Sequence, residues 1–301
     1  MNLAQIRAFH AVAMHNGFSA AAQALGVSQP AVTQHIKALE DSFGTRLFSR
    51  GGGGVELTAE GRDLLPLVHR AVMMLDDLGT RIGDGRSLRV GHLGIGICAP
   101  YVVMPILKRF STQHPGVRID MRLDNSSRLL DLVAANRVNL AVATLLEPDA
   151  AFLCEPLVEQ RVLALIPVGH SWWQRESVPV GDLEGRAFVL REPGSMTRQL
   201  FELGIAQAGV NVDLRLALGS REAVKEAVAS GLGLGIVLDK ELGHDPRLRG
   251  IPITGVAMSA VEYVVALPEV ASLGATAAFV AAARAIYGRP GRRPRKPRPQ
   301  S

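Results

Sequence analysis

The sequence has few of the features that would assign it to several common protein classes. Its 301 residues include only two cysteines, Cys98 and Cys154, which lie far apart in no metal-binding or redox spacing. No apolar run reaches the roughly 18 residues of a membrane helix, and no basic patch with a following apolar block marks a signal peptide. Charged residues make up only 20% of the chain against 48% hydrophobic ones, which excludes wholesale disorder. We therefore expect a folded cytoplasmic protein with reduced thiols and no membrane association; a disulfide switch between the two cysteines is the alternative.

The signatures of common enzyme classes are also missing. Residues 231–235 (GLGLG) are not followed by the last glycine of the G-x-G-x-x-G dinucleotide fingerprint. They also come before a predicted strand, whereas the fingerprint comes after one. There is no Gly-x-Ser-x-Gly, and the eight histidines show no metal pairing, so His92, His170 and His244 are expected to be structural or solvated. We predict a protein that is not an enzyme and holds no metal or cofactor.

The net charge of +5 is located at one end of the chain. The segment after Gly288 holds six Lys and Arg residues, four prolines and no acid, so residues 1–288 carry a net charge of −1. Such a composition predicts an extended, disordered, solubilising tail at 288–301; nonspecific contact with a phosphate backbone is the alternative.

Three short helices are predicted near the N-terminus. Apolar residues at helical spacing start at Leu3 and stop before Asn16-Gly17, Ser19 can cap a helix over 20–25, and Ser28 can cap a third. The third helix is expected to bury Val32, Ile36, Leu39 and Phe43 on one face, and its other face is polar. That polar face suits a major groove, because Gln29, Thr33 and Gln34 can bond to base edges and Lys37 to phosphate or guanine. The Ser28 cap and Pro30 form the start of the helix, where backbone N–H groups can bind phosphate. A small solvated helical bundle is the alternative.

This region resembles the winged helix-turn-helix of the LysR-type transcriptional regulators. The matching residues are Ala21, Ala22, Leu25, Ser28–Thr33, Ile36, Leu39, Glu40, Gly44, Arg46–Phe48, Arg50, Leu57, Thr58 and Gly61. The resemblance implies wing strands at 47–50 and 55–57, a DNA-binding domain over 1–58 and a DNA contact at Arg50. Two departures, Ala20 and the run of glycines at 51–54, replace residues that are often basic in the family, and residues 1–65 hold five Lys/Arg against five Asp/Glu.

A long helix is predicted to follow Thr58, within a linker and hinge over 59–86. Its apolar residues are spaced 4, 3, 4, 3 and 4 apart, which is a heptad seam, and Pro66 is expected to bend it. The helix could pack on its own domain, but the resemblance implies that it pairs two chains. The predicted dimerisation residues are Leu64, Val68, Ala71, Leu75, Leu78 and Ile82.

From Leu88 onward, apolar strands alternate with helical segments, which predicts an α/β domain over 87–287. Two stretches 94 positions apart, 125–135 and 219–229, look like copies of one unit, in which a serine (Ser126 or Ser220) caps a helix that leads into a strand. A strand at 88–92 is expected to reach its helix through a turn at 94–97, and a strand at 188–190 through 192–197. Two such halves make a cleft.

The cleft is predicted to bind a small anion, because helix N-termini offer unpaired N–H groups and Arg198 can grip a carboxylate or phosphate. Capping alone is the alternative explanation for the serines, and a surface position for Arg198. The predicted effector-binding residues are Gly96, Ile97, Ser126, Thr144, Ser195, Met196, Thr197, Arg198 and Ser220.

Residues 105–117, 138–142 and 227–235 resemble the LysR-type effector domain, which has the periplasmic-binding-protein fold. The resemblance implies half-domains at 88–163 plus 265–287 and at 164–264, with Asn139 where an Asp is usual. It implies a homodimer assembling to a homotetramer on double-stranded promoter DNA, an effector that alters the DNA bend, and RNA polymerase as a further partner. The segment 191–198 resembles versions associated with phosphonate or other oxyanions. A periplasmic ligand-binding protein is the other reading, which the missing signal peptide and the helix-turn-helix disfavour.

Overall fold

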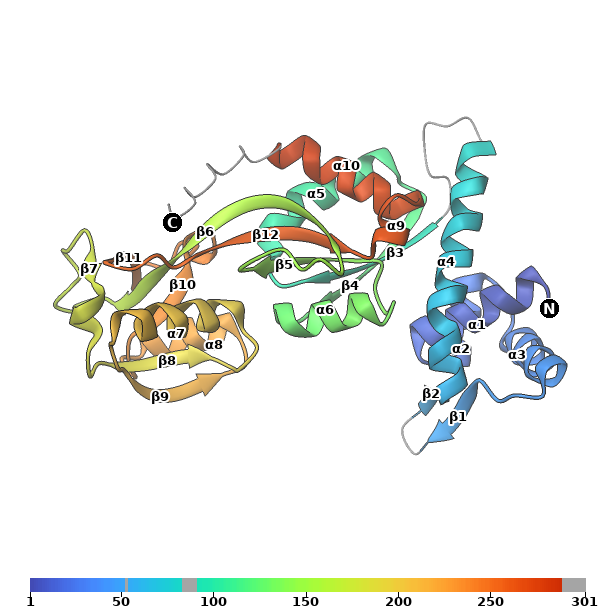
Figure 1. The fold of residues 1–301 in the computed structure, drawn as a ribbon, viewed down its shortest axis with the longest axis horizontal. Coiled ribbons are helices and arrows are strands. Elements are labelled where there is room, and N and C mark those ends of the chain that lie inside the picture. The colour runs from blue at the N-terminus through green and yellow to red at the C-terminus, as the bar shows by residue number, and fades with distance from the viewer. Residues whose placement is uncertain (52–53, 83–90, 289–301) are drawn as a thin grey trace, which may run out of the picture.

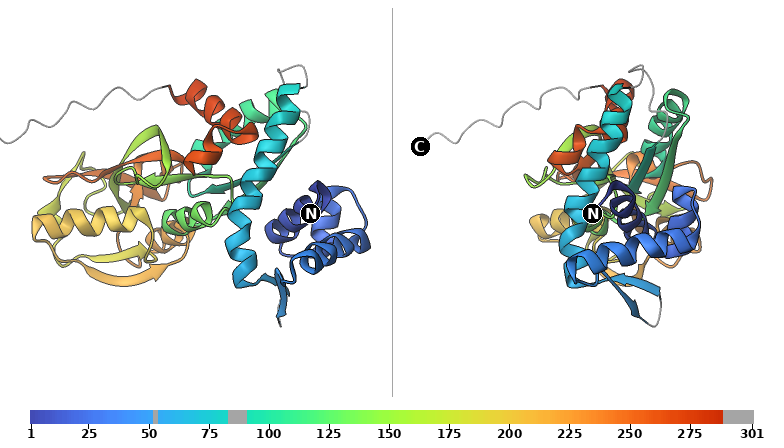
Figure 2. Two further views of the ribbon diagram at one scale, coloured as in Figure 1. Left: turned by 45° about the vertical axis from the view of Figure 1, so that its right-hand side comes forward. Right: turned by 90° about the vertical axis from the view of Figure 1, so that its right-hand side faces the viewer.

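The computed structural model describes residues 1–51, 54–82 and 91–288 of the chain. A helical N-terminal domain, the long helix α4 (Ala59–Ile82) and a larger α/β domain follow one another, and α4 stands between the other two parts (Figures 1 and 2). None of the described helices is long and apolar enough to span a bilayer. The predicted tail and the hinge glycines at 83 and 85 lie outside the described residues, as do the side chains of Arg50 and Ile82.

The N-terminal domain is three helices followed by a two-stranded wing: α1 (Leu3–His15), α2 (Phe18–Leu25), α3 (Gln29–Phe43), β1 (Phe48–Gly51) and β2 (Gly54–Leu57). Ser28 caps α3 by accepting a hydrogen bond from Ala31 N, as predicted. The prediction that Ser19 caps α2 is wrong. The N-cap is Gly17, and the Ser19 hydroxyl donates instead to Gln29 Oε1 at 3.1 Å.

Helix α4 joins the core of the N-terminal domain. Its residues Leu65, Val68 and Val72 are buried with Phe9 of α1 and Ile36 of α3 in one apolar cluster. Its start is fixed to the wing, because Thr58 caps it by accepting from Gly61 N at 3.0 Å while the Thr58 hydroxyl donates to Arg46 O. Gly61 has to be glycine, since a Cβ there would lie 2.2 Å from Leu47 O. The predicted cap at Thr58 is confirmed.

The first half of the α/β domain is a mixed sheet covered on both faces. Helices α5 (Pro100–Gln113) and α10 (Gly274–Tyr287) pack on one face and α6 (Ser126–Ala134) on the other, with the short α9 (Pro268–Ala271) beside α4. The strands run in the order β4 (Val117–Leu123), β3 (Gly91–Ile97), β5 (Leu140–Leu145), β12 (Ser259–Ala266) and β6 (Leu153–Pro167).

The second half continues from the far end of β6, which pairs there with two further strands (Figure 1). Helix α7 (Met196–Ala208) packs in one apolar cluster of this half and α8 (Arg221–Ala229) in another. The repeated unit predicted from the sequence is confirmed, because α6 leads to β5 and α8 leads to β10. The remaining elements are β7 (Val178–Pro179), η1 (Val180–Leu183), β8 (Ala187–Arg191), β9 (Asp213–Leu218), β10 (Gly235–Leu238), η2 (Asp239–Glu241) and β11 (Leu248–Thr254).

Two local predictions in the α/β domain are wrong. Residues 94–97 form the end of strand β3 and no turn, since Gly96 only makes room for α6: a Cβ there would lie 2.7 Å from Leu129 Cδ2. Ser126 does not cap α6. Asn125 does, by accepting from Arg128 N at 3.1 Å, and this frees the Ser126 hydroxyl to accept from Thr144 N across the cleft floor.

A buried chain of hydrogen bonds joins the N-terminal domain to the α/β domain through α4. Asn139 Oδ1 accepts from Gly94 N, so its amide donates to His69 Nε2 at 3.2 Å. His69 Nδ1 therefore carries the hydrogen that faces His10 Nε2 at 2.9 Å. Both rings must be neutral for these bonds to form. Burial lowers the pKa of His10 well below its ordinary value and that of His69 to about 4.

Candidate functional site

The polar face of α3 is exposed as the sequence predicts. Val32, Ile36 and Leu39 are buried on the opposite side. The prediction for Phe43 is wrong, because this last residue of α3 is 64% exposed. Thr33 turns its hydroxyl back to Gln29 O at 3.0 Å, so its methyl group and the flanking side chains form the outer surface. The exposed residues are Ser28, Gln29, Pro30, Thr33, Gln34 and Lys37. They lie along the outer face of α3 and at its N-cap, which we call the α3 strip, and polar side chains on such a face suit base edges in a nucleic-acid groove.

The wing is held to α3 by one buried carboxylate. Glu40 accepts hydrogen bonds from Leu47 N at 2.7 Å and Phe48 N at 3.3 Å, and it pairs with Arg46. The Arg46 side chain is itself 83% exposed. Glu40 thus makes α3 and the wing one rigid unit, and it places a cation beside the α3 strip.

Helix α4 has a second apolar face that the described part of the chain leaves uncovered. Leu67, Met74 and Leu78 are 55%, 57% and 53% exposed, and with Ala71 they repeat at spacings of 4, 3 and 4. Of the predicted seam, Val68 lies in the chain's own core, Leu64, Ala71 and Leu75 are half-buried, and Leu78 is exposed. The uncovered stripe therefore has the predicted heptad spacing shifted by three positions, and it shares Ala71 and Leu78 with the predicted seam.

The cleft between the two halves is lined by the first turns of three helices. Residues at the starts of α6, α7 and α8 converge there with the ends of β3, β5 and β8. Since the first N–H groups of a helix lack partners within it, three such starts give the cleft positive potential. Its lining residues are Cys98, Asp124, Asn125, Ser126, Thr144, Arg191, Ser195, Met196, Thr197, Arg221 and Glu241.

The cleft is closed in this structure. Arg221 Nη2 donates to Cys98 O at 3.2 Å, and Asn125 Nδ2 donates to Glu192 Oε1 at 3.5 Å, so both contacts cross from one half to the other. The open space at its centre is about 20 Å³, room for about one water molecule. A larger ligand therefore requires the halves to separate.

A buried ion pair lies at the wall of the cleft. Arg221 Nη2 donates to Glu241 Oε1 at 2.5 Å, and the two side chains are only 17% and 3% exposed. Burial raises the pKa of Glu241, and the Arg221 charge opposes that rise. Arg191 is half-buried beside them and pairs with Glu192 at 2.8 Å. Among the described residues that line the cleft, these two guanidinium groups are the cations available to an anion.

The floor of the cleft holds a fully buried carboxyl group. Glu262 accepts from Thr144 Oγ1 at 2.8 Å and from Gln160 Nε2 at 3.0 Å, and Tyr101 donates to Gln160 Oε1. Burial raises the pKa of Glu262 to about 7, although the Thr144 hydrogen bond lowers it. The floor can therefore take up a proton near neutral pH.

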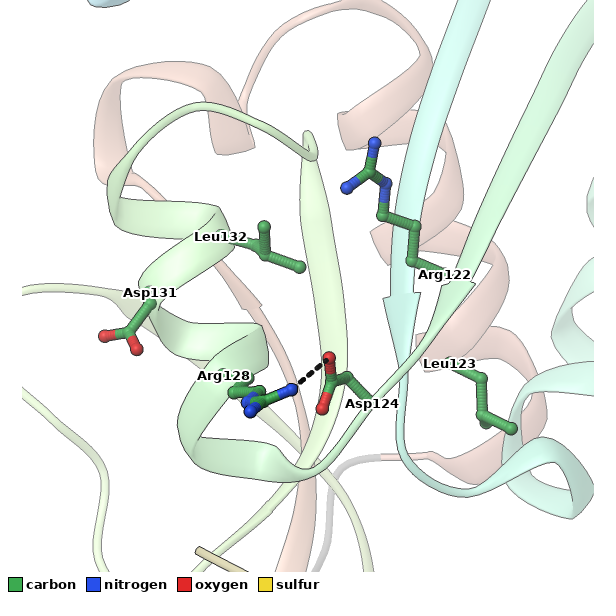
Figure 3. Close-up of a pocket in the computed structure, with 6 residues that line it drawn as sticks. All are labelled: Arg122, Leu123, Asp124, Arg128, Asp131 and Leu132. Atoms are coloured by element: carbon green, nitrogen blue, oxygen red, sulfur yellow. Dashed lines mark ion pairs between the residues drawn. The ribbon is translucent and has the colours of Figure 1, made fainter. Parts of the chain in front are cut away.

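A separate, open pocket lies on the outer edge of the first half (Figure 3). It is formed where the edge strand β4 meets α6, and its lining residues include an ion pair between Arg128 and Asp124. Its apolar lining includes Leu123, which is 68% exposed. This pocket is open to solvent and adjoins the cleft, with which it shares Asp124.

Comparison with known proteins decides the family. Residues 83–287 match the LysR substrate binding domain, and residues 3–62 match the bacterial regulatory helix-turn-helix protein, lysR family. The chain belongs to the LysR family of transcriptional regulators. It is a DNA-binding regulator with an effector-binding domain, as the sequence predicts.

Relatives and solved structures agree with this assignment. The chain is 31% identical to the HTH-type transcriptional regulator CbbR of Rhodospirillum rubrum over 238 residues, 78% of this chain and 79% of that one. A full-length OxyR variant from Pseudomonas aeruginosa has the same fold, with a TM-score of 0.74, 20% identity and coverage of 94% and 95%. The Synechocystis CcmR regulatory domain in complex with 2-PG matches 66% of this chain and 98% of that domain, at a TM-score of 0.59 and 23% identity.

Some of the predicted effector-binding residues of this LysR-type regulator meet in the cleft and others do not. Ser126, Thr144, Ser195, Met196 and Thr197 line it. The remaining four lie elsewhere: Gly96 and Ile97 are packed inside β3, Arg198 pairs with Glu202 and donates to Arg191 O, and Ser220 caps α8.

The cleft residues that the sequence interpretation missed are mainly charged. Arg191 is the last residue of β8, and Arg221 directly follows the Ser220 cap of α8. Strand ends and helix starts of this domain meet at the cleft, so these positions in the sequence could have identified both arginines as cleft residues. Glu241 lies in the short η2 helix, where no local pattern marks it. The pairing of Glu241 with Arg221 can be recognised only from the structure.

The structure disfavours Cys98 as a reactive thiol. It is half-buried beside Glu262, and its removal from solvent together with that carboxylate raises the pKa of Cys98 to about 12. A thiol that stays protonated is a poor nucleophile. Burial also raises the pKa of Cys154, and both cysteines are free in this structure.

Proposed function

We propose that this protein binds promoter DNA as a homodimer assembling to a homotetramer, and that a small anion in the cleft changes how it binds and bends that DNA. The observation that carries the proposal is the convergence of three helix starts and two guanidinium groups on one cleft of a LysR-type effector domain. The protein performs no chemistry and needs no cofactor; it acts in the cytoplasm, where promoter DNA and RNA polymerase are its partners.

The hydroxyl groups of the cleft support an anionic effector. Ser195 begins α7 but its side chain makes no capping hydrogen bond, and Ser126 is likewise released from capping. Both are therefore placed to donate to a carboxylate, phosphonate or phosphate. The Synechocystis CcmR regulatory domain, which has the same fold, is known in complex with 2-PG, and this supports a small ligand here.

The closed cleft supports control by a shift between conformations. An effector has to displace the Arg221–Cys98 and Asn125–Glu192 contacts, so it stabilises an open or rearranged state relative to the closed one. The hydrogen bonds through His69 and Asn139 connect the first half to α1, which packs on α3. A movement of the halves is thereby transmitted to the α3 strip.

Two uncovered apolar surfaces support self-association. One is the α4 stripe of Leu67, Ala71, Met74 and Leu78. The other is the pair of outer strands, where Met121 and Leu123 of β4 and Leu214 and Leu216 of β9 are exposed. Two independent surfaces are what a dimer of dimers requires.

A mobility-shift assay tests the proposed function directly. Purified protein is titrated onto its own upstream intergenic DNA at several salt concentrations, with and without a panel of small carboxylates, phosphonates and phosphates. Saturable, sequence-dependent binding that one anion alters supports the proposal. Binding that ignores sequence, or that no anion changes, contradicts it.

Substitutions on α3 should separate base reading from phosphate contact. Gln34→Ala is expected to cost about 1–3 kcal/mol on the operator and to relax specificity at one base pair, whereas Lys37→Ala is expected to weaken all sequences alike and to reduce the salt slope by about one. His244→Gln, an exposed substitution far from α3, is the control. Equal effects of Gln34→Ala on operator and random DNA would contradict the base-reading role.

Charges on the α4 stripe should break the dimer. The double variant Met74→Glu, Leu78→Glu is expected to sediment as a monomer and to lose operator affinity by at least about tenfold, because two half-sites are then bound separately. Both positions are exposed, so the chain should fold normally. Leu203→Glu, on the equally exposed part of α7, is the matched control. An unchanged sedimentation coefficient would rule out this stripe as the dimer contact.

A further inference from the structure

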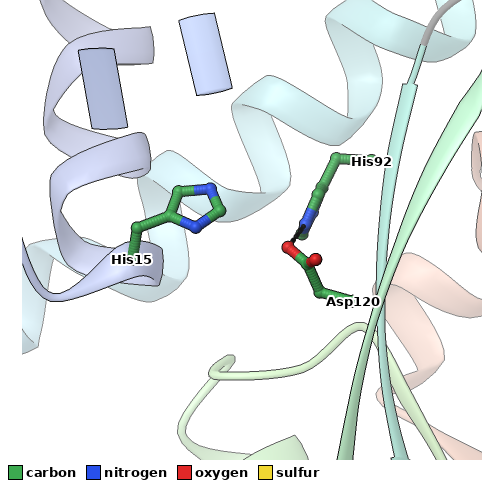
Figure 4. A group of neighbouring side chains, drawn as sticks. All are labelled: His15, His92 and Asp120. Carbon is green, nitrogen blue, oxygen red and sulfur yellow. Dashed lines mark hydrogen bonds and ion pairs between the residues drawn. The ribbon is translucent and has the colours of Figure 1, made fainter. Parts of the chain in front are cut away.

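Three potential metal ligands meet where the N-terminal domain touches the α/β domain. His15 is the last residue of α1, His92 lies on β3 and Asp120 on β4, and Figure 4 shows the three side chains converging. Their ligand atoms all lie within 4.8 Å of one another, and His92 Nε2 is 2.7 Å from Asp120 Oδ2. The side chains are partly exposed, so an ion can reach them from solvent.

We propose that these three residues bind a divalent transition-metal ion of the Zn²⁺ type, which clamps the DNA-binding domain to the effector domain. Two imidazoles and one carboxylate are a ligand set that such ions prefer, and they leave a fourth position to water. None of the spacings in the sequence marks the site, because the ligands come from three separate elements.

The present geometry is close to that of a bound ion. Metal–ligand bonds of about 2.0–2.1 Å with tetrahedral angles put the ligand atoms about 3.3 Å apart. The His92–Asp120 pair therefore opens by about half an ångström, and His15 moves inward by at most about 1.5 Å. Rotation of the side chains and a small shift of α1 suffice for both adjustments.

The surroundings support a cation at this point. The C-terminal end of α1, with its unpaired carbonyl groups, has negative potential beside His15. Arg118 lies 3.8 Å from the outer carboxylate oxygen of Asp120, where it orients that group and leaves Oδ2 for the ion. The positive charge of Arg118 opposes metal binding in part, as does Arg137, which donates to Asn16 Oδ1 next to His15.

Metal binding would act on the junction between the domains. One ligand, His15, lies on α1, which packs against α3. The other two, His92 and Asp120, lie on the sheet that carries the cleft. The junction already includes the His10–His69–Asn139 chain, the Arg137–Asn16 contact and the packing of α4 on α9 and α10. An ion would add bonds that tie α1 directly to the sheet. Occupied protein should therefore hold α1 more firmly.

The test uses the full-length protein stripped with a chelator and titrated with Co²⁺ and Zn²⁺. We expect one ion per chain, a Co²⁺ visible spectrum typical of four-coordination, and displacement of Co²⁺ by Zn²⁺. His15→Gln, His92→Gln and Asp120→Asn should each remove the spectrum, while His244→Gln, which changes an exposed histidine elsewhere, should keep it. Thermal unfolding checks that each variant is folded. His15→Gln should disturb the fold least, because His15 is the last residue of α1.

The outcome can be separated from that of the proposed function, since neither DNA nor an effector is present. A six-coordinate Co²⁺ spectrum, or a spectrum that survives all three ligand substitutions, would overturn the proposal. Slower amide hydrogen exchange in α1 on adding Zn²⁺ to the wild type, absent in His92→Gln, would support the clamp; exchange that Zn²⁺ does not change would overturn it.

Discussion

Replacing Arg221 with methionine is expected to lower the free energy of unfolding by about 3 kcal/mol at neutral pH, because it leaves the Glu241 carboxylate buried without its partner. Urea unfolding of the full-length protein measures this loss. Glu241, whose pKa is already raised by burial, should then bind a proton more readily, so the variant is expected to recover stability as the pH falls.

Two further variants separate stability from effector binding. Arg221→Met with Glu241→Leu removes both charges and should regain most of the stability, yet remain unresponsive to the anion that acts on the wild type. Arg247→Met removes an arginine that forms two ion pairs at the surface, and it should cost less than about 1 kcal/mol. If Arg221→Met costs no more than Arg247→Met, the cleft pair is not buried as described.

Acid is expected to weaken the junction between the domains. The pKa of His69 falls from 6.5 in the unfolded chain to about 4 in the fold, chiefly because the ring is buried. Burial also lowers the pKa of His10, and the neighbouring His69 adds to that effect. The folded state therefore binds fewer protons, and stability is lost as the pH falls from 6.5 through 4. His69 alone contributes about 3 kcal/mol to this loss, since one pKa unit is worth about 1.36 kcal/mol.

The measurement is urea unfolding between pH 7.5 and 4 with a chelator present, so that bound metal does not contribute. His69→Gln is the informative variant, because a glutamine amide can accept from Asn139 and donate to His10 without titrating. It should flatten the pH dependence, whereas His244→Gln should leave it unchanged. A wild-type stability that stays constant from pH 6.5 to 4 would refute the neutral His10–His69 pair.

The fold was largely predictable because its signals are local. The Ser28 cap, the heptad spacing after Thr58 and the two helix–strand copies each occupy a few consecutive residues. Errors arose where glycine or serine has two physical uses. Gly94 and Gly96 suggested a turn, but they serve close packing inside a buried strand, and Ser126 suggested a cap that the neighbouring Asn125 provides.

The site was less predictable, because its important contacts join distant segments. Serines of the cleft could be located from helix starts, but Arg221 acquires its role from Glu241, twenty positions further on, and from the Cys98 carbonyl in the other half. Likewise the register of the α4 stripe depends on which side the chain's own core covers. Val68 fits a dimer seam by spacing, and it is buried against its own domain.

The order of strands also bears on how the chain is made. Strand β12 pairs with both β5 and β6, yet it is separated from β5 by the whole second half. During synthesis β5 emerges long before residues 259–266 exist to pair with it, so one side of a fully buried strand stays open until nearly the whole protein has left the ribosome. The second half can close its sheet first, and the half that touches the DNA-binding domain is then completed last.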